Sequence, residues 1–189
     1  MLPISEVSCV VRPAREADLW VLSSILANSF HPNSSWHRWL YPFVRLGIYE
    51  DLRHRLRDTT ISSVCLVAAV VSQHGDRSIE ELAGTVELSL KTPSLFLPSG
   101  QQYPYISNLA VRAECRRRGL ARQLLTACEQ QAVEWGFAHL YLHVLEDNSR
   151  ARPLYDKLGY RLHRVESTLA SAWFGQPRRL FLHKSLKRS

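Results

Sequence analysis

The sequence lacks any hydrophobic run close to the roughly twenty residues that a membrane-spanning helix needs. It also lacks internal repeats and low-complexity segments. Of its 189 residues, 46% are hydrophobic and 22% are charged, which is the composition of a folded globular domain. A chain of this length buries roughly 70% of its unfolded surface. We therefore expect one soluble domain over residues 1–189, with no membrane association and no need for a disulfide or a structural metal.

Cysteine is scarce and is not arranged in pairs. The four cysteines, at positions 9, 65, 115 and 128, form no C-x-x-C motif, and three of them lie in apolar runs. We expect them to be buried, reduced thiols. The first nineteen residues enter a strand-turn-helix pattern at once, which leaves no room for a signal or transit peptide. Both features favour a cytoplasmic location.

Two common nucleotide-binding motifs are also missing. There is no G-x-x-x-x-G-K-[ST], and no G-x-G-x-x-G followed by an acidic residue about twenty positions later. These absences argue against an ATPase and against a dinucleotide-binding enzyme.

Basic residues outnumber acidic ones, 24 to 17, and the formal net charge is +7. Five arginines fall between Arg112 and Arg122, and a second basic group lies between Arg178 and Arg188. This excess favours an anionic partner. No groove-reading helix and no alternation of aromatic with basic residues accompanies it, so we expect no stable nucleic-acid partner.

The segment YISNLAVRAECRRRGLAR, from Tyr105 to Arg122, combines a strand-like run with an arginine-rich turn and the start of an amphipathic helix. A helix start presents unpaired backbone N–H groups and about half a positive charge, which together bind an anion. Gly119 lets a ligand approach the main chain closely. Fixed positive charge surrounds it, from Arg116, Arg117, Arg118 and Arg122. The segment therefore predicts a site for a diphosphate, and hence for a phosphorylated cofactor.

Hydrophobic periodicity predicts the element order β-α-α-β-β-β-α-β-α-β-β. The expected strands cover residues 9–12, 64–72, 82–90, 105–111, 139–145, 160–166 and 179–185, with a turn at 73–77. The expected helices cover residues 13–29, one or two segments within 36–57, residues 121–135, and a short helix that ends at 158. Within 139–145, Leu140, Leu142 and Val144 alternate with His139, Tyr141 and His143, so the two sets point to opposite faces. The pattern indicates a mixed α/β sheet.

The turn contains the motif R-x-x-G-x-A, from Arg116 to Ala121, and the segment NSRARPLYDKLGY follows it from Asn148 to Tyr160. In these two segments the chain resembles the GCN5-related N-acetyltransferases (GNAT), most strongly from Tyr105 to Arg164. Bacterial and plastid members and the ribosomal-protein alanine acetyltransferases are the most similar. The resemblance implies the GNAT fold, with a mixed central sheet of six or seven strands and helices on both faces. It also implies acetyl-coenzyme A as the acetyl donor and no metal.

The resemblance assigns the cofactor contacts residue by residue. Backbone groups of Leu109, Ala110 and Val111 would bind the pantetheine arm as an added strand does, and one N–H there would polarise the acetyl oxygen. The Asn148 side chain would hydrogen-bond the same arm. The pyrophosphate would lie on the turn and the helix start, at Arg116, Arg117, Arg118, Gly119, Leu120, Ala121 and Arg122.

Four residues are candidates for proton transfer. Tyr155 occupies the family's general-acid position, seven residues after Asn148, where a phenol can protonate the departing thiolate. Packing on the apolar face of its helix is the alternative role for Tyr155. His143 lies where the ribosomal enzymes carry glutamate and where a eukaryotic N-terminal acetyltransferase subfamily carries histidine, assisted by a tyrosine that Tyr105 matches here. Glu87 is the reserve base.

The acceptor is expected to be an amine on a protein or peptide. An α-amine with a pKa near 7.7–8.0 is appreciably neutral at pH 7, whereas fewer than about one lysine in two thousand is neutral. We therefore favour the N-terminal α-amine, with the lysine side chain as a second acceptor. Specificity is expected from two aromatic segments, residues 31–41 and 167–176. The tyrosine pair of the ribosomal enzymes is missing from the second segment, which argues against a ribosomal substrate.

Two alternatives stay open. The same chemistry could act on a small amine, which would call for an acidic acceptor pocket. The chain could also be a non-catalytic acyl-coenzyme A sensor, although it retains Tyr155, Asn148 and His143. The sequence predicts a monomer or a homodimer.

Overall fold

The computed structural model describes residues 7–30, 45–54, 63–74, 77–92, 102–166 and 177–186. Its elements follow the predicted order, and the second helix is residues 45–54. The strands are β1 (Val7–Pro13), β2 (Ser63–His74), β3 (Arg77–Lys91), β4 (Tyr103–Val111), β5 (His139–Leu145), β6 (Arg161–Glu166) and β7 (Arg179–Ser185). The other helices are α1 (Leu19–Phe30), α3 (Leu120–Glu134) and α4 (Arg152–Lys157).

The strands are hydrogen-bonded in the order β1-β2-β3-β4-β5-β7-β6. β4 and β5 run parallel, whereas the pairs β1–β2, β5–β7 and β6–β7 are antiparallel. Among the described residues the sheet is therefore mixed and has seven strands, which confirms the predicted fold class. The chain divides into two compact units. The first unit is Met1–Glu87 with Asn108–Ala127, and the second unit is Leu88–Ser107 with Cys128–Ser189.

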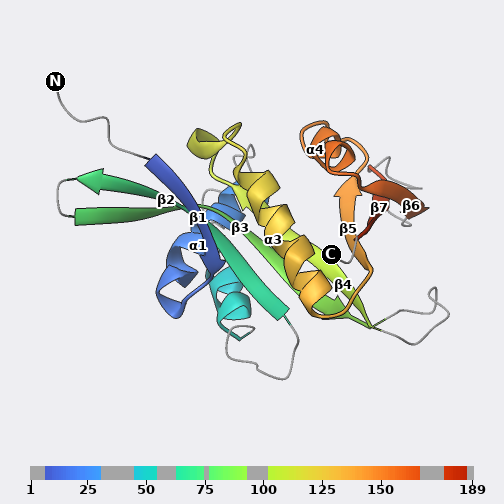
Figure 1. Cartoon of the computed structure of the whole chain (residues 1–189), viewed down its shortest axis with the longest axis horizontal. Helices are drawn as coiled ribbons and strands as arrows, with labels where there is room; N and C mark the ends of the chain where they lie inside the picture. Colours follow the sequence, from blue (N-terminus) through green and yellow to red (C-terminus); the bar gives the residue numbers. More distant parts are fainter. Residues whose placement is uncertain are drawn as a thin grey trace. The chain divides into compact units, whose positions relative to one another are not determined.

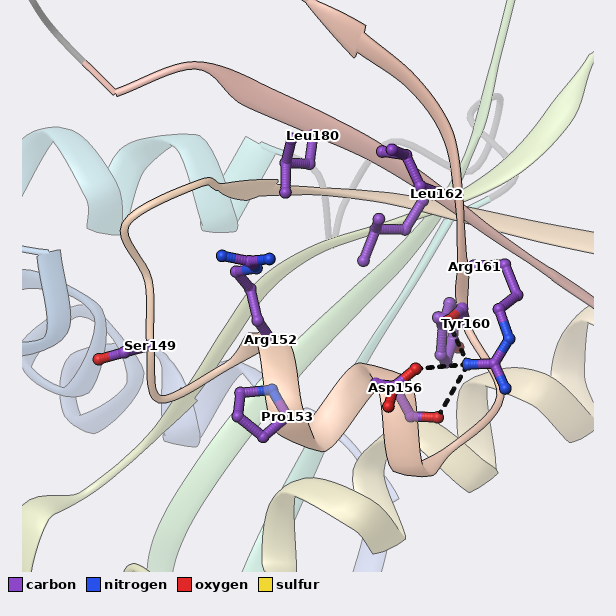
Figure 2. Close-up of a pocket in the computed structure, with 9 residues that line it drawn as sticks. Ser149, Arg152, Pro153, Asp156, Tyr160, Arg161, Leu162 and Leu180 are labelled. Atoms are coloured by element: carbon purple, nitrogen blue, oxygen red, sulfur yellow. Dashed lines mark hydrogen bonds and ion pairs between the residues drawn. The ribbon is translucent and has the colours of Figure 1, made fainter.

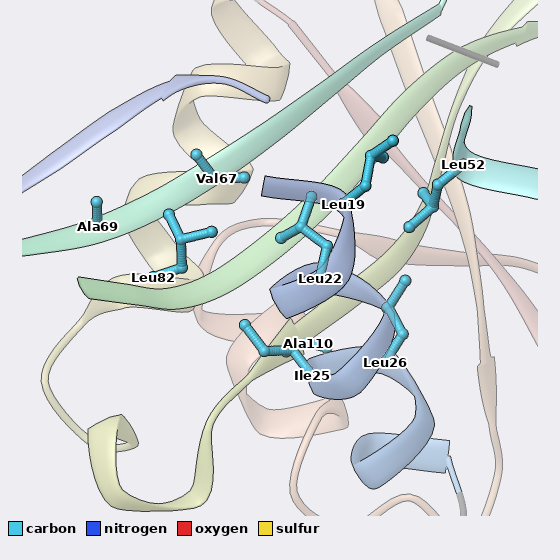
Figure 3. Close-up of a cluster of buried hydrophobic side chains, with 9 residues drawn as sticks. All are labelled: Leu19, Leu22, Ile25, Leu26, Leu52, Val67, Ala69, Leu82 and Ala110. Carbon is cyan, nitrogen blue, oxygen red and sulfur yellow. The ribbon is translucent and has the colours of Figure 1, made fainter. Parts of the chain in front are cut away.

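In the first unit, β1 lies beside β2 in a continuous register from Val7↔Ser72 to Pro13↔Leu66 (Figure 1). Apolar residues spaced three and four apart give α1 a buried stripe. Figure 3 shows this stripe facing side chains from β2, β3 and β4, and the cluster comprises Leu19, Leu22, Ile25, Leu26, Leu52, Val67, Ala69, Leu82 and Ala110. Each fully buried leucine contributes about 2 kcal/mol. The cluster therefore holds the end of β4 in place within this unit.

In the second unit, β5 pairs with β4 at Tyr105↔Tyr141 and Ile106↔Leu142 and with β7 along its whole length. The predicted alternation in β5 is confirmed, because Leu140, Leu142 and Val144 are buried and the residues between them are more exposed. The opposite face of these strands carries stacked rings, and Tyr141 and His143 both stack on Phe181 of β7. One face of β5 is therefore part of the buried core, and the other packs on the Phe181 ring.

Strand β6 contains a bulge. Leu162 pairs with Leu182 of β7, but Arg164 pairs with Phe181, so His163 is an extra residue between them. Because side chains alternate between faces, one extra residue moves every later side chain to the other face. Arg164 and Glu166 therefore share the face of Phe181 rather than that of Leu180.

Several predicted boundaries need correction. The predicted turn at 73–77 is shorter, since β2 extends to His74 and β3 begins at Arg77. Of the four cysteines, predicted to be buried, only Cys128 is buried, and Cys9, Cys65 and Cys115 are half-buried. The predicted helical region 36–57 is described only at 45–54, and the two predicted acceptor segments lie outside the described residues. Within the described ranges, no helix is long and apolar enough to cross a membrane, and no three metal-ligating side chains gather.

Gly84 of β3 allows close contact with β4. A Cβ at this position would lie 2.9 Å from the carbonyl oxygen of Ala110 and 3.1 Å from the Val111 side chain. We predict that Gly84→Ala lowers the free energy of unfolding by about 1–3 kcal/mol, because a backbone atom must move. Gly47 is the matched control, since it is helical and a Cβ added there would meet no atom within 4 Å.

Gly47→Ala should leave the free energy of unfolding unchanged or raise it by up to about 1 kcal/mol, because alanine is the better helix former. Urea denaturation of both variants measures these changes. Equal stability of Gly84→Ala and the wild type would show that β3 and β4 are not in close contact here.

Candidate functional site

The start of α3 in the first unit is the predicted anion site. Its first backbone bond runs from the N–H of Gln123 to the carbonyl of Gly119, at 3.1 Å. The amides of Leu120, Ala121 and Arg122 precede that bond and have no carbonyl partner within the helix. The Leu120 side chain is buried, at 3% exposure, which fixes the helix start against the unit. Three amides and the positive end of the helix dipole thus point to the same place.

The arginines of the turn have different roles. Arg112 forms ion pairs with Glu81 and Glu114, and Nε of Arg116 donates to the carbonyl of Val111 at 3.1 Å. Arg112 thus ties the turn to β3, and Arg116 ties it to the end of β4. By contrast, within the described ranges Arg117, Arg118 and Arg122 have no ion pair, and all three are exposed. Their charge is available to an anionic ligand.

The backbone of the turn is left-handed at two positions. Arg117 has φ 63° and Gly119 has φ 81°. A Cβ on Gly119 would meet no protein atom within 4 Å. Glycine is therefore favoured here by the backbone conformation, and the space above it is open to a ligand.

Strand β4 is irregular next to the predicted pantetheine contacts. Asn108 takes φ 54° in the middle of the strand, and its Nδ2 donates to Oε2 of Glu87 at 2.8 Å. Glu87 is 3% exposed. The predicted reserve base thus supports the residue that breaks the regular strand just before Leu109. Sequence analysis missed Asn108, although asparagine is among the few residues that tolerate positive φ.

A pocket of about 520 Å³ adjoins this turn within the first unit. One wall is the exposed side of α1, and the other is the segment from Val111 to Arg116. Trp20, at 57% exposure, lines the pocket and carries the Arg45 guanidinium over its ring at 3.6 Å. The pocket is therefore lined by the Trp20 ring on one side and by the basic turn on the other.

The predicted pair Tyr105 and His143 is in direct contact in the second unit. The Tyr105 hydroxyl lies 2.9 Å from Nδ1 of His143. The His143 side chain is 16% exposed, and its ring stacks on Phe181 at 4.6 Å between centroids. Burial raises the pKa of Tyr105, and the nearby Arg179 cation opposes that rise.

The other nitrogen of His143 is also occupied. Nε2 lies 2.9 Å from Oε2 of Glu166, and Arg164 binds Oε1 of the same carboxylate at 2.6 Å. Burial lowers the pKa of His143, Arg179 lowers it further, and Glu166 opposes both. Sequence analysis missed Glu166, because the bulge that brings it to this face has no recognisable sequence signal.

Tyr155 is buried on α4 at 7% exposure. Burial, together with the nearby Tyr105, raises its pKa to about 12. Its ring packs edge to face on Tyr160, 5.8 Å away, which is the packing role, and the general-acid role stays a prediction. Over the described part of the chain its hydroxyl has no hydrogen-bond partner. The phenol therefore keeps its proton at neutral pH and is able to offer it to a ligand.

Asn148 closes the turn before α4. Its Oδ1 accepts the N–H of Ala151 at 3.0 Å, and its carbonyl accepts the N–H of Arg152 at 3.2 Å. The side chain is exposed. Its Nδ2 donors remain available for the predicted contact with the pantetheine arm.

A second pocket, of about 550 Å³, lies beside α4. Figure 2 shows Arg152 pointing across it from the helix and Leu162 and Leu180 lining it from the strands. Arg161 closes one end by binding Asp156. Leu180 and Leu182 alternate with Phe181, so this pocket opens on the face of β7 opposite to His143. It is separate from the proton-transfer residues.

The roles of these residues stay predictions. The structure divides the residues between the two units. Arg117, Arg118, Arg122, Gly119 and Glu87 belong to the first unit, and Tyr105, His143, Asn148 and Tyr155 belong to the second. Strand β4 runs through both units, from Tyr105 to the backbone of Leu109, Ala110 and Val111.

Comparison with known proteins agrees with these features. The model of the acetyltransferase (GNAT) family matches residues 33–160. The chain is 30% identical over 174 residues to GCN5-related N-acetyltransferase 10, chloroplastic, of Arabidopsis thaliana, covering 89% of this chain and 68% of that protein. It is 34% identical over 85 residues to GCN5-related N-acetyltransferase 7, chloroplastic, of the same plant, covering 45% of this chain and 31% of that protein.

Solved structures show the same fold. Arabidopsis thaliana NAA60 in complex with a bisubstrate analogue superposes with a TM-score of 0.68 at 22% identity, over 95% of this chain and 100% of that one. The Escherichia coli ribosomal-protein-S18-alanine N-acetyltransferase superposes with a TM-score of 0.62 at 17% identity, over 96% of each chain. By the matched family model and the similarity to its plant relative, the chain belongs to the GNAT family of acetyltransferases, acyltransferases that use acetyl-coenzyme A.

Proposed function

We propose that the protein transfers the acetyl group of acetyl-coenzyme A to an amine of a protein or peptide, with the N-terminal α-amine preferred and the lysine ε-amine as a second acceptor. The amine attacks the thioester directly, while donor and acceptor are bound together. The observation that carries the proposal is the hydrogen bond of 2.9 Å between Tyr105 and His143. It supplies a proton acceptor suited to an amine that is already partly neutral.

The cofactor side of the proposal uses residues of the first unit and Asn148, which lies in the turn before α4. The amides of Leu120, Ala121 and Arg122 would bind the pyrophosphate, and Arg117 and Arg118 would add charge. The bound cofactor would supply the activated acetyl thioester. Backbone groups of Leu109 to Val111 and the Asn148 amide would orient its pantetheine arm.

The choice of acceptor follows from pKa values. Burial first, and then the Arg179 cation, lower the pKa of His143 below its usual value of 6.5. At pH 7 the imidazole is then neutral and is able to take a proton, but it is a weak base. Such a base suits an α-amine with a pKa near 8 better than a lysine near 10.4.

Tyr155 would interact with the leaving group, the thiolate of coenzyme A. Its pKa of about 12 exceeds the usual thiol value near 8.5, so complete proton transfer to the thiolate is uphill. A hydrogen bond from the neutral phenol to the developing thiolate has no such cost. Tyr155 would therefore stabilise the thiolate by donating, before the proton arrives.

We propose a cytoplasmic protein made of one acetyltransferase domain, acting as a monomer or a homodimer. The names of the Arabidopsis relatives describe those proteins as chloroplastic. Microscopy of the fluorescently tagged protein in its own host would test the location.

The first prediction concerns the acceptor. Incubation with acetyl-coenzyme A and a library of peptides, each in a form with a free and a form with a blocked N-terminus, should give faster acetylation of free α-amines than of lysines. Mass spectrometry locates the acetyl group. Turnover of small amines without any peptide would favour the small-amine alternative, and cofactor binding without turnover would favour the sensor.

The second prediction concerns the turn. Gly119→Ala should weaken acetyl-coenzyme A binding about tenfold, or by about 1.4 kcal/mol, because the added methyl enters the space that the diphosphate would fill. Gly136→Ala is the matched control, since Gly136 has φ 86° and an equally open Cβ position at the other end of α3. Calorimetric titration measures both affinities, and equal affinities would place the diphosphate elsewhere.

The third prediction concerns the base. His143→Ala should lower kcat by about 10²–10⁴-fold and leave the affinity for acetyl-coenzyme A unchanged. His139→Ala, on the same face of β5, should keep the wild-type rate. Because the pKa of His143 is lowered, first by burial and then by Arg179, wild-type kcat should fall only below pH 6.5, and this fall should be absent in His143→Ala. An unaffected rate would move the base to Glu87 or to water.

A further inference from the structure

Both ring nitrogens of His143 have partners in the second unit. Nδ1 lies 2.9 Å from the Tyr105 hydroxyl, and Nε2 lies 2.9 Å from a carboxylate oxygen of Glu166. Neither nitrogen is left to meet an acceptor amine directly. A proton that reaches His143 must therefore pass through one of its two partners.

The chemistry of the partners fixes the direction of each bond. An ionised carboxylate only accepts, so Nε2 of a neutral His143 must carry the hydrogen and donate it to Glu166. Nδ1 is then the acceptor, and the hydroxyl of Tyr105 is its donor. The Tyr105 oxygen then has two lone pairs as acceptors. The Arg179 side chain interacts with this oxygen, which leaves one lone pair to receive a proton.

We infer that Glu166 is a positioning residue that fixes His143 as the Nε2–H tautomer, so that the proton of the acceptor amine enters at the Tyr105 oxygen and ends on Nδ1 of His143. The inference rests on the proposed function, because it names how that reaction loses its proton. Glu166 itself does not touch the acceptor.

The transfer balances without any further reactant. As the amine nitrogen bonds to the acetyl carbon, the carbon–sulfur bond breaks and coenzyme A leaves as the thiolate with the bonding electron pair. The amine proton moves to the oxygen of Tyr105. The hydroxyl proton of Tyr105 moves at the same time to Nδ1 of His143. Tyr105 ends neutral, and His143 ends as an imidazolium whose charge is balanced by Glu166. The imidazolium then returns its proton to water by way of the Tyr105 hydroxyl.

The charges around His143 support this use of Glu166. Arg179 of β7 and Arg164 of β6 both disfavour an imidazolium, and Glu166 is the group that favours it. Burial would raise the pKa of Glu166, but hydrogen bonds from Arg164 and the nearby His143 hold it below its usual value. The carboxylate thus stays ionised at neutral pH and is fixed in place by Arg164.

The experiment uses two substitutions that separate charge from hydrogen bonding. Glu166→Gln keeps an oxygen that accepts from Nε2 but loses the charge, and Glu166→Leu loses both. Glu146→Gln is the matched control, because Glu146 also binds an arginine, Arg178, through both oxygens. The ring nitrogens are observed by ¹⁵N NMR in histidine-labelled protein, with His143→Ala identifying the signals. The dependence of kcat on pH is measured in parallel.

We expect the wild type and Glu146→Gln to show the Nε2–H tautomer at His143. Glu166→Gln should keep this tautomer but titrate at lower pH, moving the acid limb of kcat in the same direction. Glu166→Leu should show mixed tautomers and a kcat reduced at least about tenfold. A wild-type Nδ1–H tautomer, or wild-type behaviour of both Glu166 variants, would overturn the inference. Absence of turnover in the wild type would reject the proposed function, while the NMR result would still decide the role of Glu166.

Discussion

The first amides of an α-helix have no carbonyl partner within the helix, and the proposed cofactor site of this protein depends on these unpaired amides at Leu120, Ala121 and Arg122. The structure leaves these amides next to a left-handed Gly119 and three arginines without carboxylate partners among the described residues. Arg112 meanwhile ties the turn to β3, and Arg116 ties it to the end of β4. The positive charge is therefore divided between residues that build the turn and residues that are free to bind an anion.

Two local departures from regular strand geometry place the remaining groups. Asn108 interrupts β4 beside the backbone that would bind pantetheine, and Glu87 holds Asn108 in that conformation. The extra residue in β6, His163, turns Arg164 and Glu166 toward the face of His143. In a regular β6 these two side chains would lie on the face of Leu180, beside the pocket under α4. One inserted residue thus decides which charges surround the imidazole.

Much of this could be read from the sequence, because periodic burial leaves a strong pattern. The alternation of Leu140, Leu142 and Val144 and the arginine-rich turn before a helix start both follow from local rules. The Tyr105–His143 pair came from family resemblance, and the structure brings the two side chains into contact. Glu166 could not be predicted, because a bulge depends on pairing between strands rather than on local sequence. The sequence also could not show which arginines bind carboxylates or carbonyls and which have no ion pair, because this depends on the groups that the fold brings next to them.

The central claim is that main-chain amides hold the cofactor, and hydrogen exchange measures those amides directly. The protein should be exchanged with and without saturating coenzyme A and analysed residue by residue. The account predicts slower exchange on binding at Leu109 to Val111 and at Leu120 to Arg122. No change at either segment, or protection confined to the pocket beside α4, would contradict it.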